Sequence, residues 1–306
     1  MANLIFNPTN GQWINLDKPG GQVFFVDGGT PAYRGKGGSA NNSGLRPEQA
    51  LTGTTTSSSD GLNAVMDKVV SGRGDTIALL PGSITNTAVV TVDKDDVTFL
   101  GVGDTGGSTR ASAIVGNLAS TGDVFGVTGV GVTFENLQFS ATTAACTSRI
   151  NAGAAGLTIR NCTFFCGATD LLTITVEAAG TDFTVENCAF YVTANNPDSA
   201  IKLEGTSSRA TIRNNVFDGG TNTNAWDVGA INSGAIHTGC LVENNTNHEG
   251  PSIIFSAAAT GIIRNNHMGG HTLDSALDPG SCFSFNNYEA DAIDESGALE
   301  PGTVAS

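Results

Sequence analysis

The amino-acid sequence predicts an all-β solenoid, in which short strands wind around one axis and successive coils stack on each other. The first observation is a repeated phrase, because VTFENLQF at 132–139 returns as LTIRNCTF (157–164), FTVENCAF (183–190) and ATIRNNVF (210–217). The second is that no segment between these copies is long and periodic enough for a crossover helix. A period of about 20–30 residues built only of strands and bends indicates coils that bury their apolar faces on one another.

The N-terminal part precedes the repeat, and we divide it into two segments. Residues 1–22 carry too many apolar side chains for a free tail, so we expect them to form a docking arm. Residues 23–76 begin with the strand FFVDGG (24–29) and continue through a polar Gly/Ser/Thr-rich loop. At 59–70 the sequence SDGLNAVMDKVV places its apolar side chains on one helical stripe, which predicts an amphipathic helix capping the first coil.

Residues 77–290 form the predicted stack of about eight coils. Weaker copies of the phrase are CLVENNTN (240–247), GIIRNNHM (261–268) and FSFNNYEA (283–290). In every copy, apolar and polar residues alternate before an asparagine, which is strand periodicity with one face buried. A second strand precedes several copies, for example DLLTITV at 170–176, so each coil holds about three short strands.

The repeated asparagine is the main candidate for a structural site. Asparagine tolerates the left-handed backbone that a sharp bend requires, and stacked coils place equivalent residues about 4.8 Å apart. We therefore expect these side chains to form a ladder of amide hydrogen bonds along the axis. The predicted ladder consists of Asn136, Asn161, Asn187, Asn214, Asn244, Asn265 and Asn287. Their unequal spacing of 21 to 30 residues is assigned to loops. The chain after Asn287 carries five acids and no base, and we interpret its last segment, residues 291–306, as either a solvated tail or a docking arm.

The copies and their asparagines resemble the right-handed parallel β-helices of the pectate-lyase-like superfamily, in which an asparagine ladder commonly occupies a sharp turn. The resemblance covers about residues 23–290. It implies a right-handed parallel β-helix solenoid, but it leaves the function open because lyases, hydrolases, adhesins and phage virion proteins share this fold.

Composition and charge exclude several classes of protein. The 14 basic and 29 acidic residues give a net charge of −15, which opposes binding to nucleic acid. No run of about 18 apolar residues is present, so no membrane span is predicted. The six cysteines do not follow a zinc-site spacing, and we interpret them as buried thiols, with Cys162 and Cys188 stacked in consecutive coils.

The sequence offers acids but no catalytic motif. Glycan-cleaving enzymes need two carboxylates about 5–10 Å apart. Neighbouring coils could supply such a pair as Glu177 and Glu204, but we interpret the charges around the first strand series as solubilising. The residues concerned are Asp170, Glu177, Asp198, Lys202 and Glu204. Phenylalanines such as Phe134, Phe164, Phe190 and Phe217 are assigned to the core. No catalytic, cofactor-binding or metal-binding residue is predicted.

These observations lead to an expected function without enzymatic activity. The resemblance implies a structural phage virion protein, either a trimeric capsid decoration (cement) protein or a tail-surface protein. Its expected partners are its own copies, a major capsid or tail protein and a cell-surface glycan, with neither nucleic acid nor membrane. The expected location is the virion surface, or otherwise outside the cell. The alternatives are a polysaccharide lyase or glycoside hydrolase of the tailspike-depolymerase kind, which an acidic groove along the first strand series would favour, and a glycan-binding adhesin.

Overall fold

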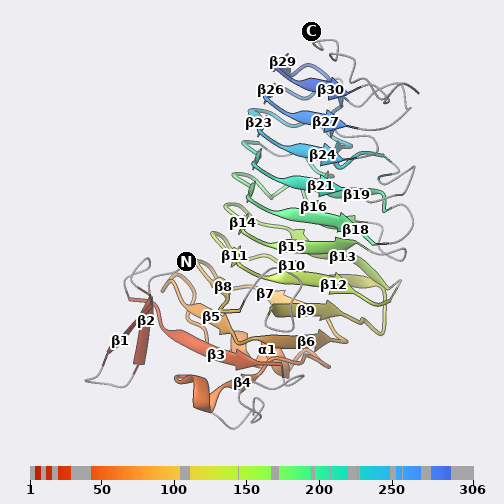
Figure 1. Ribbon diagram of the computed structural model, residues 1–306. Coiled ribbons are helices and arrows are strands. Elements are labelled where there is room, and N and C mark those ends of the chain that lie inside the picture. Colours follow the sequence, from red (N-terminus) through yellow and green to blue (C-terminus); the bar gives the residue numbers. More distant parts are fainter. Residues whose placement is uncertain are drawn as a thin grey trace.

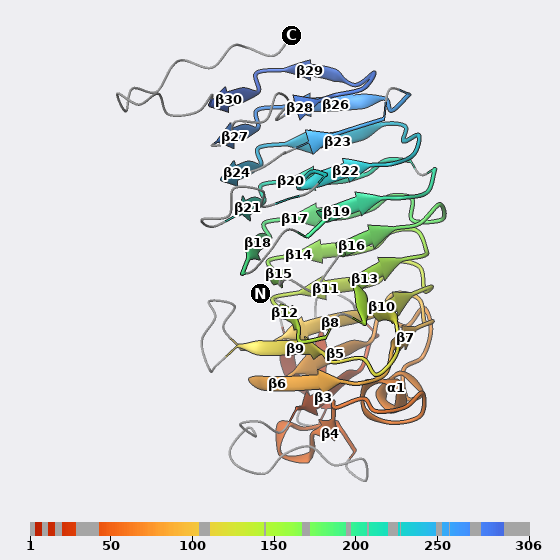
Figure 2. The same cartoon turned by 90° about the vertical axis from the view of Figure 1, so that its right-hand side faces the viewer.

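The protein is an all-β parallel solenoid of about eight turns, seen here in a computed structural model (Figure 1). The structure describes residues 4–7, 12–15, 20–28, 43–103, 111–143, 145–166, 172–193, 197–206, 208–219, 226, 228–248, 253–256, 258–269 and 277–290. Figures 1 and 2 show the coils stacked along one axis, with the N-terminal elements at one end and the last coil at the other. The predicted stack of parallel coils is therefore confirmed.

Three parallel sheets run along the stack, and each full coil contributes one strand to each of them. The sheet that we call sheet I has eight strands: β7 (Val90–Val92), β10 (Gly122–Val127), β13 (Cys146–Ala152), β16 (Leu172–Val176), β19 (Ser199–Leu203), β22 (Ile231–Ser233), β25 (Ile253–Ile254) and β28 (Leu277–Asp278).

Sheet II follows in each coil and has eleven strands in the order in which they neighbour one another: β4 (Leu51–Thr52), β3 (Val23–Asp27), β5 (Thr76–Leu79), β8 (Thr98–Gly101), β11 (Thr133–Glu135), β14 (Thr158–Arg160), β17 (Thr184–Glu186), β20 (Thr211–Arg213), β23 (Cys240–Glu243), β26 (Gly261–Arg264) and β29 (Phe283–Phe285). Sheet III completes the coil with nine strands: β6 (Gly82–Asn86), β9 (Ser112–Gly116), β12 (Gln138–Ala141), β15 (Thr163–Cys166), β18 (Ala189–Val192), β21 (Val216–Asp218), β24 (Thr246–His248), β27 (His267–Gly269) and β30 (Tyr288–Ala290).

The core is a set of columns, because in-register parallel strands place like residues above one another. In sheet III, Phe139, Phe164, Phe190 and Phe217 are buried and stack face to face with ring centroids 4.8–4.9 Å apart. In sheet I the inward column consists largely of isoleucines from successive strands. The alternation of the sequence therefore places one side chain per strand in each column of the core.

The bends between sheets II and III are made by the repeated asparagines. Six of the seven predicted residues have a left-handed backbone with φ of 54–58°, and in the last coil this residue is Asn286 rather than Asn287. The bend N–H donates to a carbonyl of the next coil, as from Asn187 to Arg213 at 3.2 Å. Asparagine thus occupies the position where most residues would be strained.

The amphipathic cap helix predicted at 59–70 is not what the structure contains. Helix α1 (Gly61–Met66) has only six residues, and Val70 is half exposed. Beyond the helix the chain continues in turns, and the Val70 N–H donates to the Asp75 carboxylate at 2.9 Å. The Asn63 side chain joins the helix to β7: its amide nitrogen donates to the Val89 carbonyl and its oxygen accepts from the Thr91 N–H, both at 2.9 Å.

Three other elements lie near the N-terminus. Strands β1 (Leu4–Asn7) and β2 (Gln12–Asn15) form an antiparallel pair within the predicted docking arm, and η2 (Pro47–Gln49) precedes β4. Whether residues 1–22 dock elsewhere stays a prediction. The predicted acidic tail, residues 291–306, lies outside the described residues.

Candidate functional site

A buried amide ladder runs beside the bends, one residue further along the chain than most of the predicted ladder. Its members are Asn215, Asn245, Asn266 and Asn287, all less than 4% exposed. The side-chain oxygens of Asn245, Asn266 and Asn287 each accept two hydrogen bonds from the preceding asparagine, as Asn245 does from the Asn215 backbone and side-chain nitrogens at 3.0 Å. Each side-chain nitrogen also donates to a carbonyl of the preceding coil, as from Asn245 to Ile212 at 3.0 Å.

The predicted ladder is therefore wrong in register for six of its seven residues. Asn136, Asn161, Asn187, Asn214, Asn244 and Asn265 form the bends, and their side chains are half or fully exposed. The physical reason is the direction of the backbone, since a residue with positive φ turns its side chain outward and the following residue points inward. Only Asn287 belongs to the buried ladder as predicted.

Two cysteines take the place of asparagine in the same slot. Cys162 and Cys188 are buried there, and their thiols point at the carbonyls of Phe134 and Ile159 at 3.7 Å. These carbonyls are equivalent to the Ile212 carbonyl, which accepts the hydrogen bond of the Asn245 side chain in a later coil. The Cys188 N–H donates to the Asn215 amide oxygen at 2.9 Å, so the ladder joins directly onto the thiol pair. The prediction that the two cysteines stack as thiols is confirmed, since both are free.

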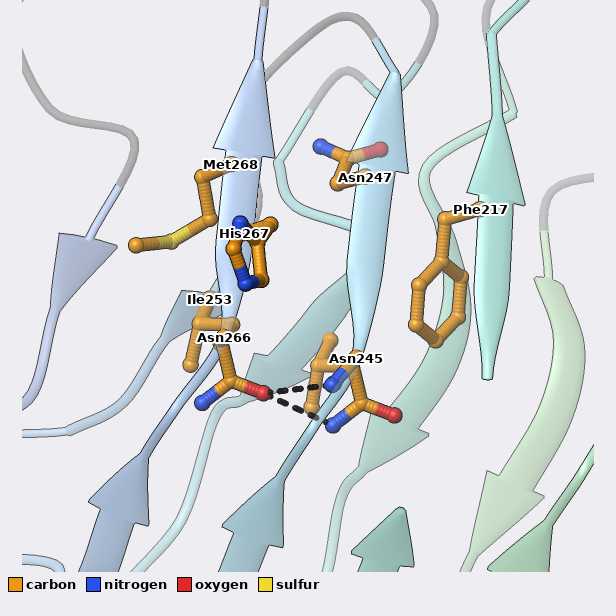
Figure 3. A pocket seen from close by; sticks show the side chains of 8 residues that line it. Phe217, Asn245, Asn247, Ile253, Asn266, His267 and Met268 are labelled. Atoms are coloured by element: carbon orange, nitrogen blue, oxygen red, sulfur yellow. Dashed lines mark hydrogen bonds between the residues drawn. The ribbon is translucent and has the colours of Figure 1, made fainter. Parts of the chain in front are cut away.

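A small cavity lies next to this ladder in the last coils (Figure 3). The phenylalanine column ends at Phe217 and continues as Asn247 and Met268, which leave room for about one water molecule. Figure 3 shows the Asn266 oxygen at the cavity accepting both hydrogen bonds from Asn245. The cavity is part of the coil interior, so we interpret it as a packing defect rather than as a ligand site.

The outer face of sheet II carries a column of alternating charges, which we call the charge column. It contains one residue from each of six successive strands: Glu135, Arg160, Glu186, Arg213, Glu243 and Arg264. Each arginine pairs with the glutamate of the preceding coil at 2.6–2.9 Å. The glutamates are 5–18% exposed and the arginines 40–44%, so the guanidinium groups cover the carboxylates.

The outer face of sheet I carries a hydrogen-bonded network centred on Asp123. This carboxylate accepts hydrogen bonds from Thr147 at 2.8 Å, Ser148 at 2.7 Å and Asn151 at 2.9 Å, all from the next coil. The Asn151 amide also reaches Glu177, one coil further, at 3.3 Å. The spacing of these residues in the sequence matches no motif, and only the register of β10 and β13 brings them together.

Two of the acids predicted on this face have described side-chain partners. Glu204 pairs with Lys202 at 2.7 Å, and Glu177 accepts the bond from Asn151. Asp198 lies directly before β19, where its backbone carbonyl accepts a hydrogen bond from Ser199 at 2.7 Å. Asp170 lies outside the described residues. The carboxylates whose bonds are described thus connect strands or neighbouring residues of the stack.

Burial also limits the chemistry of the thiols and of one histidine. Burial raises the pKa of the Cys188 thiol well above its ordinary value and that of Cys240 to about 12. Such thiols are protonated at neutral pH and are poor nucleophiles. Burial likewise lowers the pKa of His237, whose Nε2 lies 3.2 Å from the Leu203 carbonyl.

Within the described ranges, no three His, Cys, Asp or Glu side chains come together in a way that could hold a metal ion. A helix long and apolar enough to cross a membrane is likewise absent from the described part of the chain.

Comparison with known proteins adds no relative. No protein-family model matches the chain, and a search of curated proteins returns no match. The resemblance to the pectate-lyase-like superfamily therefore rests on the repeat itself, and the function has to be inferred from the geometry.

Proposed function

We propose that this protein is a non-enzymatic structural component, a stiff rod exposed on the surface of a phage virion. The observation that carries the proposal is the charge column. Its acids and bases neutralise one another from coil to coil along sheet II, so they contribute to the rigidity of the stack rather than to a reaction. The virion assignment is supported by the resemblance to phage proteins with a parallel β-helix.

The proposed assembly is a homotrimer that acts as a capsid decoration protein or lies on the tail, in contact with a major capsid or tail protein. A charge-balanced sheet face favours lateral packing of rods, because it lacks the repulsion that a net charge of −15 would otherwise produce. Repulsion between the remaining surface charges is screened beyond about 8 Å at physiological ionic strength.

Mass spectrometry of purified virions tests the location and counts the copies. A decoration protein is expected in many copies per particle and a tail protein in few, whereas absence from the particles would overturn the virion assignment. Light scattering of the isolated protein is expected to give about three times the chain mass of 31.1 kDa. A mass of one chain at all salt concentrations would refute the trimer.

An assay on a broad glycan panel tests the proposal against the enzyme alternative. We expect no reducing ends and no unsaturated products. Turnover that disappears in Glu204→Gln, on sheet I, but persists in the control Glu186→Gln, on sheet II, would overturn the proposal in favour of a lyase or hydrolase. Glycan binding without turnover would instead support an adhesin.

A further inference from the structure

The last coil is open on one side in the described part of the structure. Strands β28, β29 and β30 are each the final strand of their sheet. Asn287 is the last described rung of the amide ladder. The exposed Phe283 and Tyr288 continue the outward columns of Ile262 and His267 and so face the sides of the stack. Unpaired strand edges at the end of a stack are a surface that folded proteins normally cover.

The C-terminal segment repeats the sequence of this last coil. Residues 275–284 read SALDPGSCFS, and residues 297–306 read GALEPGTVAS. Ala, Leu, Pro, Gly and Ser recur at the same places, and Asp/Glu, Ser/Thr and Cys/Val are conservative replacements. The offset of 22 residues falls within the 21 to 30 residues that separate equivalent positions elsewhere in the stack. This copy lacks the repeated asparagine phrase.

The shared turn is specific to a stacked coil. Gly280 has φ of +57°, and a Cβ at this position would lie 2.1 Å from the Ser256 carbonyl oxygen of the coil beneath. The turn is closed by bonds from Gly280 to the Asp278 carboxylate at 3.1 Å and from Cys282 to the Pro279 carbonyl at 3.0 Å. Glycine is therefore required here because a neighbouring coil passes underneath, and the repeat preserves it together with the acid and the proline.

We propose that residues 297–306 pack on the last described coil as a further layer of sheets I and II. In this register Leu299 lies over Leu277, which packs against the core, and Val304 lies over the buried Cys282. Ala305 falls beside Phe283, and Gly302 repeats the close approach made by Gly280. The occupant of the open end is thus the chain's own C-terminal segment. This inference does not depend on the proposed virion function.

Hydrogen exchange of the backbone amides at 277–285 tests the proposal in the full-length chain. Leu299→Asp places a charge in the new layer, and Gly302→Val introduces a Cβ at the close approach. Each is expected to accelerate exchange at 277–285 by about tenfold or more, while β13 and β16 are unchanged. The control Asp294→Asn, which lies outside the repeat, should have no effect.

Two results would overturn the proposal. One is equal exchange at 277–285 in the full chain and in a chain ending at Ala290. The other is protection of these amides that rises with protein concentration, which would mean that a second copy covers the end.

Discussion

Replacing Asn245 by alanine should destabilise the protein strongly, because this side chain makes four buried hydrogen bonds. Its amide nitrogen donates to Ile212 and to the Asn266 oxygen, and its own oxygen accepts two bonds from Asn215. The variant leaves the backbone N–H of Asn215 and the Ile212 carbonyl without these partners. A buried polar group that loses its partner costs about 1–3 kcal/mol, so for these two groups a loss of about 2–6 kcal/mol in unfolding free energy is expected.

Asn187→Ala is the matched control, since Asn187 is an exposed bend residue for which no side-chain hydrogen bond is described. It should lose only about 1–2 kcal/mol, the strain of alanine in a left-handed conformation, and Asn187→Gly should lose less. Asn245→Cys should fall between wild type and alanine, because a thiol can donate to Ile212 but is a weak acceptor for Asn215.

Urea denaturation followed by circular dichroism measures these differences. The midpoints should rank as wild type, Asn187→Ala, Asn245→Cys and Asn245→Ala, from most to least stable. If Asn245→Ala unfolds at the same urea concentration as Asn187→Ala, the assignment of the ladder to the buried slot is refuted.

Three further predictions concern charge and titration. Arg213→Glu places three acids in successive strands, together with Glu186 and Glu243, so it should lower the urea midpoint more than Arg213→Gln does. High salt should reduce the difference between the two variants, because it screens the repulsion. A difference that does not change with salt would contradict this prediction. Burial lowers the pKa of His237 in the folded state, so as the pH falls through about 6.5 the unfolded chain binds the proton before the folded chain does. The stability of the protein should therefore decline below this pH. His237→Gln should remove this part of the pH dependence, as measured by urea midpoints. The Cys240 thiol should not react with a thiol-specific reagent at neutral pH until the chain unfolds, and rapid labelling of the folded protein would show that the site is accessible.

The stack of coils was predictable from sequence because its signal is repeated. Alternation before each asparagine fixes which residues point inward, and the phenylalanines assigned to the core are buried in the structure. The ladder was harder to place. From Asn214–Asn215 onward each copy carries two consecutive asparagines, so either one of the pair could be the ladder residue. In the earlier copies the buried slot holds Leu137, Cys162 and Cys188, which leaves only the bend asparagine visible.

A signal for the correct phase was nevertheless present. Leucine and cysteine at the slot after the bend show that this position is buried, so an asparagine at that place must satisfy its amide inside the stack. The network around Asp123 and the partners of Glu204 could not be predicted in the same way. They depend on the register between coils of unequal length, and the sequence pattern alone does not give that register.

The charge column gives the rod a repeat that its fold does not have. The backbone repeats with every coil, but glutamate and arginine alternate from one coil to the next. The charges of the column therefore repeat only every second coil. Deleting one coil, for instance residues 188–214, would remove Arg213 and set Glu186 directly against Glu243, so that two acids become neighbours. Deleting two coils would preserve the alternation. The length of such a rod can therefore change without electrostatic penalty only in steps of two coils, and gain or loss of single coils would have to be followed by a charge reversal.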